Sequence, residues 1–360
     1  ALVAPYVGDL SKIVNATFGI IALVACISIA YSLAGTYKID QLAAAVLSLS
    51  AFLIAVPLTE DGGISLTWTG SRGLFVAMII AIITVEIQRT FVEKNLIIRM
   101  PEGVPPSVAR SFAALIPGFI SLLLVWAVNT LLLKTLNLSI PEFINNVIAI
   151  PLMNIGGTLP AMLLAVFAVQ LLWSVGIHGA AIVEGILGPL WIAFAEQNAA
   201  ARAAGEAILP NVISMQFFQI FVQSTGSGVT LPLVLLMLFT AKSKQLKAVG
   251  RAALGPGIFN INEPVTFGLP IVMNPIMIIP FIVGPLLVTT ITYFAMALNI
   301  VARPYAMIPW TTPLGLSGFL ATGDWKAGVL QIINFLVSGA VYYPFVKLYD
   351  RRKLEEEGDV

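Results

Sequence analysis

One glutamate, Glu263, lies in a long apolar stretch of the sequence. It belongs to Asn260-Ile-Asn-Glu-Pro-Val-Thr-Phe-Gly268, and the next charged residue along the chain is Arg303. A charge in such surroundings costs about 2.5–3.5 kcal/mol or more if it faces lipid, so it needs polar partners or a function. Two interpretations follow. Glu263 is either a structural carboxylate that caps a re-entrant helix, or a hydrogen-bond acceptor and general base for a polar substrate.

Neutral hydrogen-bonding groups and helix breakers accompany this glutamate. Asn260 and Asn262 supply donors and acceptors that suit the recognition of hydroxyl groups. Pro264 removes a backbone donor, and Gly268 loosens the chain further. The segment is therefore predicted to be a broken helix that exposes polar groups to a substrate.

The single histidine, His178, lies between Gly176 and Gly179 in a second interruption of an apolar run. A core histidine bonded to a neighbouring carbonyl is one interpretation. The flanking glycines allow a ligand to approach the ring and the backbone closely, which favours a binding role for His178 and Gly179. We expect no metal and no cofactor, because the only cysteine, Cys26, lies in an apolar run and suits packing.

Aromatic residues could complete a site for such a polar substrate. Trp310 and Thr311 lie in a broken segment, and the indole is a candidate for stacking on the apolar face of a sugar ring. Trp173 and Trp191 could line the same site, or could lie at the membrane interface or in packing, where tryptophan is common.

Two further charged residues have open roles. Arg72 begins an apolar run and could reach a pocket or pair with Glu60 or Asp61. Glu184 follows His178 and could be a second buried acid or a partner of a helix terminus. The sequence does not choose between these alternatives.

The elements that position these residues are predicted to be membrane helices. Hydrophobic residues make up 58% of the chain and charged residues 10%, against about 25% charged residues in a soluble domain. Runs without Asp, Glu, Lys or Arg reach or exceed the roughly 17–25 residues of a spanning helix. They cover 13–37, 41–59, 111–133, 143–183, 207–241, 264–302 and 327–346, and 73–91 is a further candidate. We expect an all-α polytopic membrane protein with about eight or more transmembrane helices, and not a barrel of short alternating strands.

Basic residues set the predicted orientation. They gather in three regions, around 89–110, at 242–251 and at 347–353. The positive-inside rule places these regions in the cytoplasm. Basic clusters of this kind also suit contact with anionic lipid. No nucleic-acid partner is expected.

The two halves of the chain differ in regularity. Breaks at 176–179, 224–228, 260–268 and 304–312 predict discontinuous helices around a site near the bilayer midplane. We predict a transmembrane scaffold over 1–135, an interfacial amphipathic linker over 136–160, a substrate-binding transport domain over 161–346 and a cytoplasmic tail over 347–360. The chain begins at Ala1 without a methionine or signal peptide, so we expect an N-terminal piece to be missing.

Several segments resemble a known family. The run from Asn262 through Glu263-Pro-Val-Thr-Phe-Gly268 to Asn274-Pro275 resembles its signature, and Gly176-Ile-His-Gly-Ala180, Gly226-Ser-Gly-Val-Thr230 and the stretch from Val104 to Phe112 are similar to its other motifs. The family is the sugar-transporting IIC membrane component of the bacterial phosphoenolpyruvate-dependent phosphotransferase system, in its lactose/cellobiose/diacetylchitobiose branch. The resemblance covers nearly the whole chain.

The resemblance implies a homodimer in the bacterial inner membrane, with an N-terminal scaffold of spans and a C-terminal substrate domain that contains two re-entrant hairpins. It implies that Glu263 contacts the 6-hydroxyl of a disaccharide as the base, and that His178 also contacts sugar. A phosphocysteine on a separate IIB protein would donate the phosphoryl group, and alternating access would carry the sugar inward. The alternative function is a proton- or sodium-coupled secondary transporter of a polar solute. The sequence does not reveal which disaccharide is bound.

Overall fold

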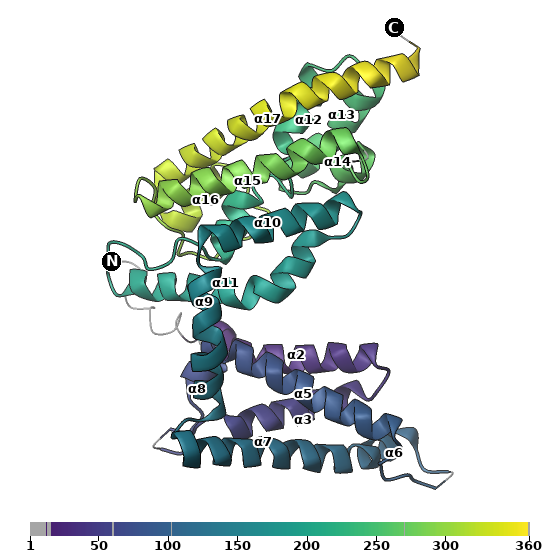
Figure 1. The fold of residues 1–360 in the computed structure, drawn as a ribbon, viewed down its shortest axis with the longest axis vertical. Coiled ribbons are helices and arrows are strands. Elements are labelled where there is room, and N and C mark those ends of the chain that lie inside the picture. The colour runs from purple at the N-terminus through teal and green to yellow at the C-terminus, as the bar shows by residue number, and fades with distance from the viewer. Residues whose placement is uncertain (1–11, 13–15, 60, 102, 270, 359–360) are drawn as a thin grey trace. The chain divides into compact units, whose positions relative to one another are not determined.

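The computed structural model describes residues 12, 16–59, 61–101, 103–269 and 271–358, and their regular secondary structure is helical (Figure 1). The only β-pairing in these residues is an isolated antiparallel bridge between Leu58 and Ile64. The chain divides into two compact units, Ala1–Leu152 and Met153–Val360. The predicted all-α class is confirmed.

The N-terminal unit is built on three helices that pack against one another, α2 (Ile21–Thr36), α3 (Gln41–Ala55) and α5 (Leu74–Glu93), with α7 (Leu115–Leu136) against α3 and α5. Its other elements are η2 (Phe18–Ile20), α4 (Leu66–Thr69), η3 (Ser71–Gly73), α6 (Pro106–Ala113), α8 (Ile140–Ile144), the π-helix η4 (Asn145–Ala149) and α9 (Ile150–Gly156), which continues into the second unit.

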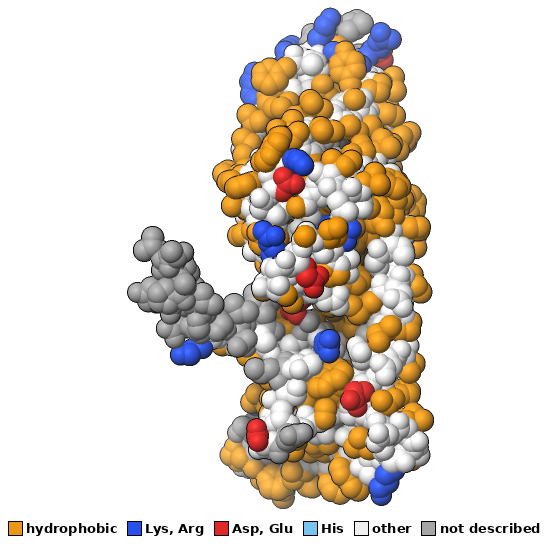
Figure 2. All heavy atoms as spheres, turned by 90° about the vertical axis from the view of Figure 1, so that its left-hand side faces the viewer, with side chains coloured by type: hydrophobic (Ala, Val, Ile, Leu, Met, Phe, Trp, Pro, Cys, Tyr) orange, Lys and Arg blue, Asp and Glu red, His pale blue; other side chains and the backbone are white. Residues whose placement is uncertain are grey.

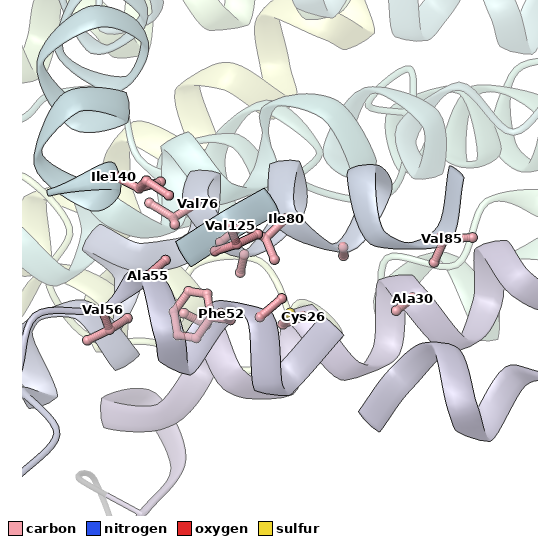
Figure 3. Close-up of a cluster of buried hydrophobic side chains, with 14 of the residues drawn as sticks. Cys26, Ala30, Phe52, Ala55, Val56, Val76, Ile80, Val85, Val125 and Ile140 are labelled. Atoms are coloured by element: carbon pink, nitrogen blue, oxygen red, sulfur yellow. The ribbon is translucent and has the colours of Figure 1, made fainter. Parts of the chain in front are cut away.

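Small residues form the core of this unit. Ala22, Cys26, Ala30 and Ala34 recur every four residues along α2, and all are fully buried. They meet Phe52, Val76 and Ile80 among others from α3 and α5 (Figure 3). Small side chains let membrane helices approach closely, where van der Waals packing holds them together. The packing interpretation of Cys26 is confirmed.

Polar groups fasten one end of these helices. Asp40 caps α3 by accepting from the backbone N–H of Ala43 at 2.8 Å, and it pairs with Arg110 at 3.2 Å. The Tyr37 hydroxyl donates to the Glu86 carboxylate at 2.6 Å, and Arg89 binds the same carboxylate. These contacts fix the α2–α3 turn to α5.

The C-terminal unit contains the helices that surround the breaks. They are α10 (Leu159–Ser174), α11 (Gly179–Ala203), the π-helix η5 (Phe217–Val222), α12 (Leu231–Phe239), α13 (Lys244–Ile258), α14 (Glu263–Gly268), α15 (Pro275–Ala297), α16 (Leu316–Thr322) and α17 (Trp325–Glu357). The long helix α17 packs along α15 and contacts α12 and α16, while α10 contacts α15 and α11 (Figure 1).

The last helix continues through the predicted tail. Asp350 accepts hydrogen bonds from the backbone N–H groups of Lys242 and Ser243. Glu357 accepts from the Ser243 hydroxyl at 2.6 Å and from the N–H groups of Lys244 and Gln245. Carboxylates are favourable at a helix N-terminus, so these two acids attach the end of α17 to the start of α13.

Five helices in the described residues are long and apolar enough to cross a membrane, or up to six if the helices on either side of residues 157–158 count as one span. The five cover 74–93, 108–136, 179–203, 275–297 and 325–357. Two predicted spans are shorter than expected, since α2 has 16 residues and α3 has 15. Helix α3 begins after the Asp40 cap and ends at Ala55, and the backbone becomes extended at Val56.

Candidate functional site

The breaks of the C-terminal unit surround one cavity of about 310 Å³. Six of the predicted site residues line it: Trp173, His178, Asn260, Asn262, Glu263 and Trp310. Ala180, Ala181, Glu184, Gln219, Gln223, Gly226 and Ser227 complete the lining. Residues more than a hundred positions apart in the sequence therefore share one polar cavity.

Glu263 is the first residue of α14 and is half-buried. No hydrogen bond or ion pair joins its carboxylate to any residue that the structure describes. Glu263 lines the cavity, so a ligand in the cavity could contact its carboxylate. A carboxylate with unused acceptor capacity beside a polar cavity is suited to accept a hydrogen bond or a proton from a substrate hydroxyl.

Asn260 holds the surrounding loops together. Its Oδ1 accepts from the backbone N–H of Thr225 at 2.6 Å, while its Nδ2 donates to the carbonyls of Trp310 and Thr312. The backbone of Asn260 has a φ of +66°, a region that asparagine tolerates better than most residues. These protein contacts occupy both ends of the amide, so Asn260 positions other groups. Its direct contact with a substrate hydroxyl stays a prediction.

Asn262 makes a similar connection. Its Nδ2 donates to the carbonyl of Ser227 at 2.7 Å and to the Thr266 hydroxyl at 3.0 Å. Gly226 lies directly against this asparagine with a φ of +90°, and a Cβ there would lie 2.6 Å from the Asn262 Cβ. The fold requires glycine at position 226, because of its positive φ and because a side chain there would overlap Asn262.

His178 caps the start of α11, because its Nδ1 accepts from the backbone N–H of Ala181 at 3.1 Å. Its ring lies 4.5 Å from the Trp173 ring, centroid to centroid, and the side chain is exposed. Gly179 is buried and does not line the cavity; a Cβ there would overlap the Val169 backbone. Gly179 therefore permits close approach of α10 and α11, and its predicted substrate contact stays a prediction.

The tryptophans differ in exposure. Trp310 is 49% exposed, so its ring can cover a ligand, whereas Trp173 is 2% exposed and presents little surface to the cavity. Trp191 is buried with its ring 4.6 Å from that of Phe218, which confirms the packing interpretation. Thr311 is half-buried and is absent from the cavity lining.

Arg72 belongs to the N-terminal unit, in η3, with an exposed side chain. Its proposed partner Glu60 falls outside the described residues. The role of Arg72 in a pocket stays a prediction.

Four polar residues of the cavity, Glu184, Gln219, Gln223 and Ser227, were not among the predicted site residues. Glu184 accepts a hydrogen bond from Gln219 Nε2 at 3.0 Å, and Gln223 Oε1 accepts from the Ser227 hydroxyl at 2.6 Å. Glu184 had two open interpretations, and the structure favours a second acid at the cavity. Gln219 and Gln223 could have been predicted as site residues, because they lie four positions apart in a mainly apolar segment and would share one face of a helix. The described residues contain no group of three or more His, Cys, Asp or Glu that could hold a metal ion.

The chain belongs to the EIIC family of the phosphotransferase system, since residues 4–285 match the family model described as "Phosphotransferase system, EIIC". It is a multi-pass membrane protein and sugar permease of a bacterial phosphotransferase system, and the resemblance noted in the sequence is confirmed.

Individual relatives cover most of the chain. It is 49% identical over 360 residues to the cellobiose-specific EIIC component of Geobacillus stearothermophilus, covering 96% of this chain and 80% of that one. It is 48% identical over 362 residues to the putative permease IIC component YwbA of Bacillus subtilis (strain 168), covering 96% and 81%. The crystal structure of ChbC, the IIC component of an N,N'-diacetylchitobiose-specific phosphotransferase system, matches with a TM-score of 0.91 at 47% identity, covering 96% and 83%.

Proposed function

We propose that this permease imports a β-linked disaccharide of the cellobiose or diacetylchitobiose type and that the sugar is phosphorylated as it is delivered. The observation that carries the proposal is the carboxylate of Glu263, which has no described protein partner and borders a polar cavity also lined by His178 and Trp310. The names of the cellobiose-specific relative and of the chitobiose-specific ChbC support the same sugar class.

In the proposed reaction, a sugar hydroxyl attacks the phosphorus of a phosphocysteine on a separate IIB protein. The new oxygen–phosphorus bond forms as the sulfur–phosphorus bond breaks, and the thiolate leaves with IIB. Glu263 orients the hydroxyl and accepts its proton, a contribution of about 10²- to 10⁴-fold for a positioned base. His178 donates to the sugar and Trp310 covers one face of a ring.

The transport step is alternating access. A substrate domain over 161–346 would move relative to a scaffold and dimerisation domain over 1–135, with the linker 136–160 between them and 347–360 in the cytoplasm. We propose eight or more spans, with the breaks near 224–228 and 260–268 in re-entrant hairpins and an interfacial amphipathic helix in the linker. The dimeric state and the docking of phospho-IIB at the basic cytoplasmic surface around 242–251 belong to the same proposal.

The test uses the purified protein in proteoliposomes. Radiolabelled cellobiose, diacetylchitobiose and lactose are each offered outside, with and without phospho-IIB enclosed. Sugar phosphate that accumulates inside only with phospho-IIB supports the proposal. Uptake of unmodified sugar that needs no IIB and collapses with the proton or sodium gradient contradicts it and supports a secondary transporter.

A further inference from the structure

A second cavity, of about 180 Å³, lies in the C-terminal unit where α11 and α15 end and α17 begins. Three cationic side chains, Arg202, Arg303 and Lys326, line it together with one acid, Asp324. Three positive charges against one negative charge leave a net charge of +2 around a small volume. Like charges gathered in this way repel one another, and a bound anion would offset the repulsion.

The one acid is already engaged by backbone groups. Asp324 Oδ1 accepts from the N–H of Lys326 at 3.0 Å, and Oδ2 accepts from the N–H of Ala302 at 3.1 Å. No ion pair within 4.0 Å joins Arg202, Arg303 or Lys326 to Asp324 or to another described residue. The acid therefore caps α17 and does not neutralise the three cations through an ion pair.

Both guanidinium groups are held in place before any ligand arrives. Arg303 Nη1 donates to the carbonyls of Leu209 and Pro210, and its Nη2 donates weakly to Asn299 Oδ1 at 3.4 Å. Its buried Nε has no hydrogen-bond partner in the described structure. The Arg202 guanidinium lies over the Tyr305 ring, 5.3 Å from its centroid. A guanidinium fixed in this way loses little rotamer freedom when it binds a planar or tetrahedral anion.

The cavity lies at the end of α17 that the positive-inside rule places outside the cell, where a cluster of cations is unusual. Helix α17 has 33 residues, which corresponds to about 50 Å and exceeds the roughly 30 Å of the hydrocarbon core. Its far end carries Lys347, Arg351, Arg352 and Lys353, which the positive-inside rule places in the cytoplasm. The cavity at its first residues would then face outward, where basic clusters are less frequent. Seen from the side where α17 begins, charged groups gather among apolar surfaces (Figure 2).

Apolar side chains adjoin these charges. Ile208 and Ile300 both line the cavity, and they are 58% and 57% exposed. Cations beside exposed aliphatic groups suit a ligand with a phosphate group at the membrane interface.

We propose that this cavity is a binding site for a phosphate group. Arg202 and Lys326 would contact the phosphate with exposed side chains, and Arg303 would contact it from a guanidinium already hydrogen-bonded to the protein. The phosphate could belong to the headgroup of an outer-leaflet anionic phospholipid or to a free inorganic ion. Arginine binds phosphate oxygens through parallel N–H donors, which gives direction as well as charge. The site is separate from the sugar cavity and does not depend on the sugar that is transported.

The test measures binding to the full chain purified in a neutral detergent. Dioctanoyl phosphatidylglycerol and inorganic phosphate are titrated separately, and dioctanoyl glycerol, which lacks the phosphate, is the ligand control. Native mass spectrometry counts bound lipid, and the thermal unfolding midpoint reports either ligand. We expect Arg202→Gln and Lys326→Gln each to weaken binding about tenfold, the size of one charge-assisted hydrogen bond. Lys134→Gln, which removes an exposed cation from α7 outside the three basic regions, is the matched control and should leave binding unchanged.

The two ligand arms distinguish the sources. Saturable binding of the lipid alone assigns the site to a headgroup, and equal binding of inorganic phosphate assigns it to a free ion. Wild-type affinity of the Arg202→Gln/Lys326→Gln double variant for both ligands overturns the proposal. Because that variant could fold poorly, Lys326→Arg is measured beside it; this variant keeps the charge and should retain binding. Loss of binding by Lys326→Arg at a wild-type circular dichroism spectrum would also overturn the proposal.

Discussion

Asn260 Oδ1 accepts a hydrogen bond from the backbone N–H of Thr225 at 2.6 Å, although the two residues are 35 positions apart. The same amide donates to the carbonyls of Trp310 and Thr312. One side chain thus joins three interrupted segments of the C-terminal unit. Both Asn260 and Thr225 have positive φ values, so the joined backbone is also unusual in conformation.

Asn260→Ala should remove this junction. The buried N–H and carbonyl groups would lose their partner, at a cost of about 1–3 kcal/mol for each group left unsatisfied. We expect a clearly lower unfolding midpoint and a loss of sugar binding, measured by thermal unfolding and isothermal titration. Asn146→Ala, at an exposed position, is the control. Unchanged unfolding and sugar affinity in Asn260→Ala would show that the junction is dispensable.

Glu263→Gln should separate binding from phosphoryl transfer. The amide keeps a hydrogen-bonding group at the cavity but cannot accept the proton of the hydroxyl, so phosphorylation should fall about 100-fold or more. Sugar affinity should change by less than about tenfold, the size of one hydrogen bond. Equilibrium binding and vesicle phosphorylation with phospho-IIB measure the two effects, with Glu206→Gln as an exposed control. Parallel loss of both activities argues against the base role.

Gly226→Ala should disturb the segment that holds Asn262. The new methyl group would meet the Asn262 Cβ at 2.6 Å in a conformation with φ of +90°. Backbone strain of this kind costs about 1–3 kcal/mol, and sugar binding should weaken because Asn262 must shift. The matched control is Gly255→Ala in α13, where a Cβ has nothing within 4 Å. If both variants have the same unfolding midpoint and sugar affinity, the close approach is unimportant.

Trp310→Ala should weaken sugar binding with little loss of stability. An aromatic contact contributes about 0.5–1.5 kcal/mol beyond burial, so the affinity should fall roughly 3- to 10-fold or more. Trp310→Phe should restore part of it, since a smaller ring still covers the sugar. Trp325→Ala removes another exposed indole, 68% exposed, from the start of α17 and serves as the control. Equal sugar affinity in wild type and Trp310→Ala contradicts the stacking role.

The sequence allowed the main site residues to be predicted because of their surroundings. Glu263, His178 and Trp310 each lie in an interruption of an apolar run, and interrupted backbone in a membrane protein must line a cavity or be buried in protein. The structure brings these three residues to one cavity. Their location at one site could therefore be predicted without knowing which segments contact one another.

Roles that depend on distant contacts could not be predicted in the same way. Asn260 was expected to bind a hydroxyl, but its amide meets backbone groups 35 to 52 positions away. The acids of the last segment were expected in a tail, yet Asp350 and Glu357 find the N-terminus of α13 more than a hundred residues earlier. Residue type alone reveals hydrogen-bonding capacity, and only the fold determines which partner uses it.

The cap of α11 also fixes the hydrogen-bonding character of the substrate cavity. Because His178 Nδ1 accepts from the Ala181 N–H, a neutral imidazole must carry its hydrogen on Nε2. The ring is therefore held in one tautomer and offers a donor, while Glu263 offers an acceptor. The cavity therefore presents a donor and an acceptor for hydroxyl groups, which come from two different interruptions of the C-terminal unit.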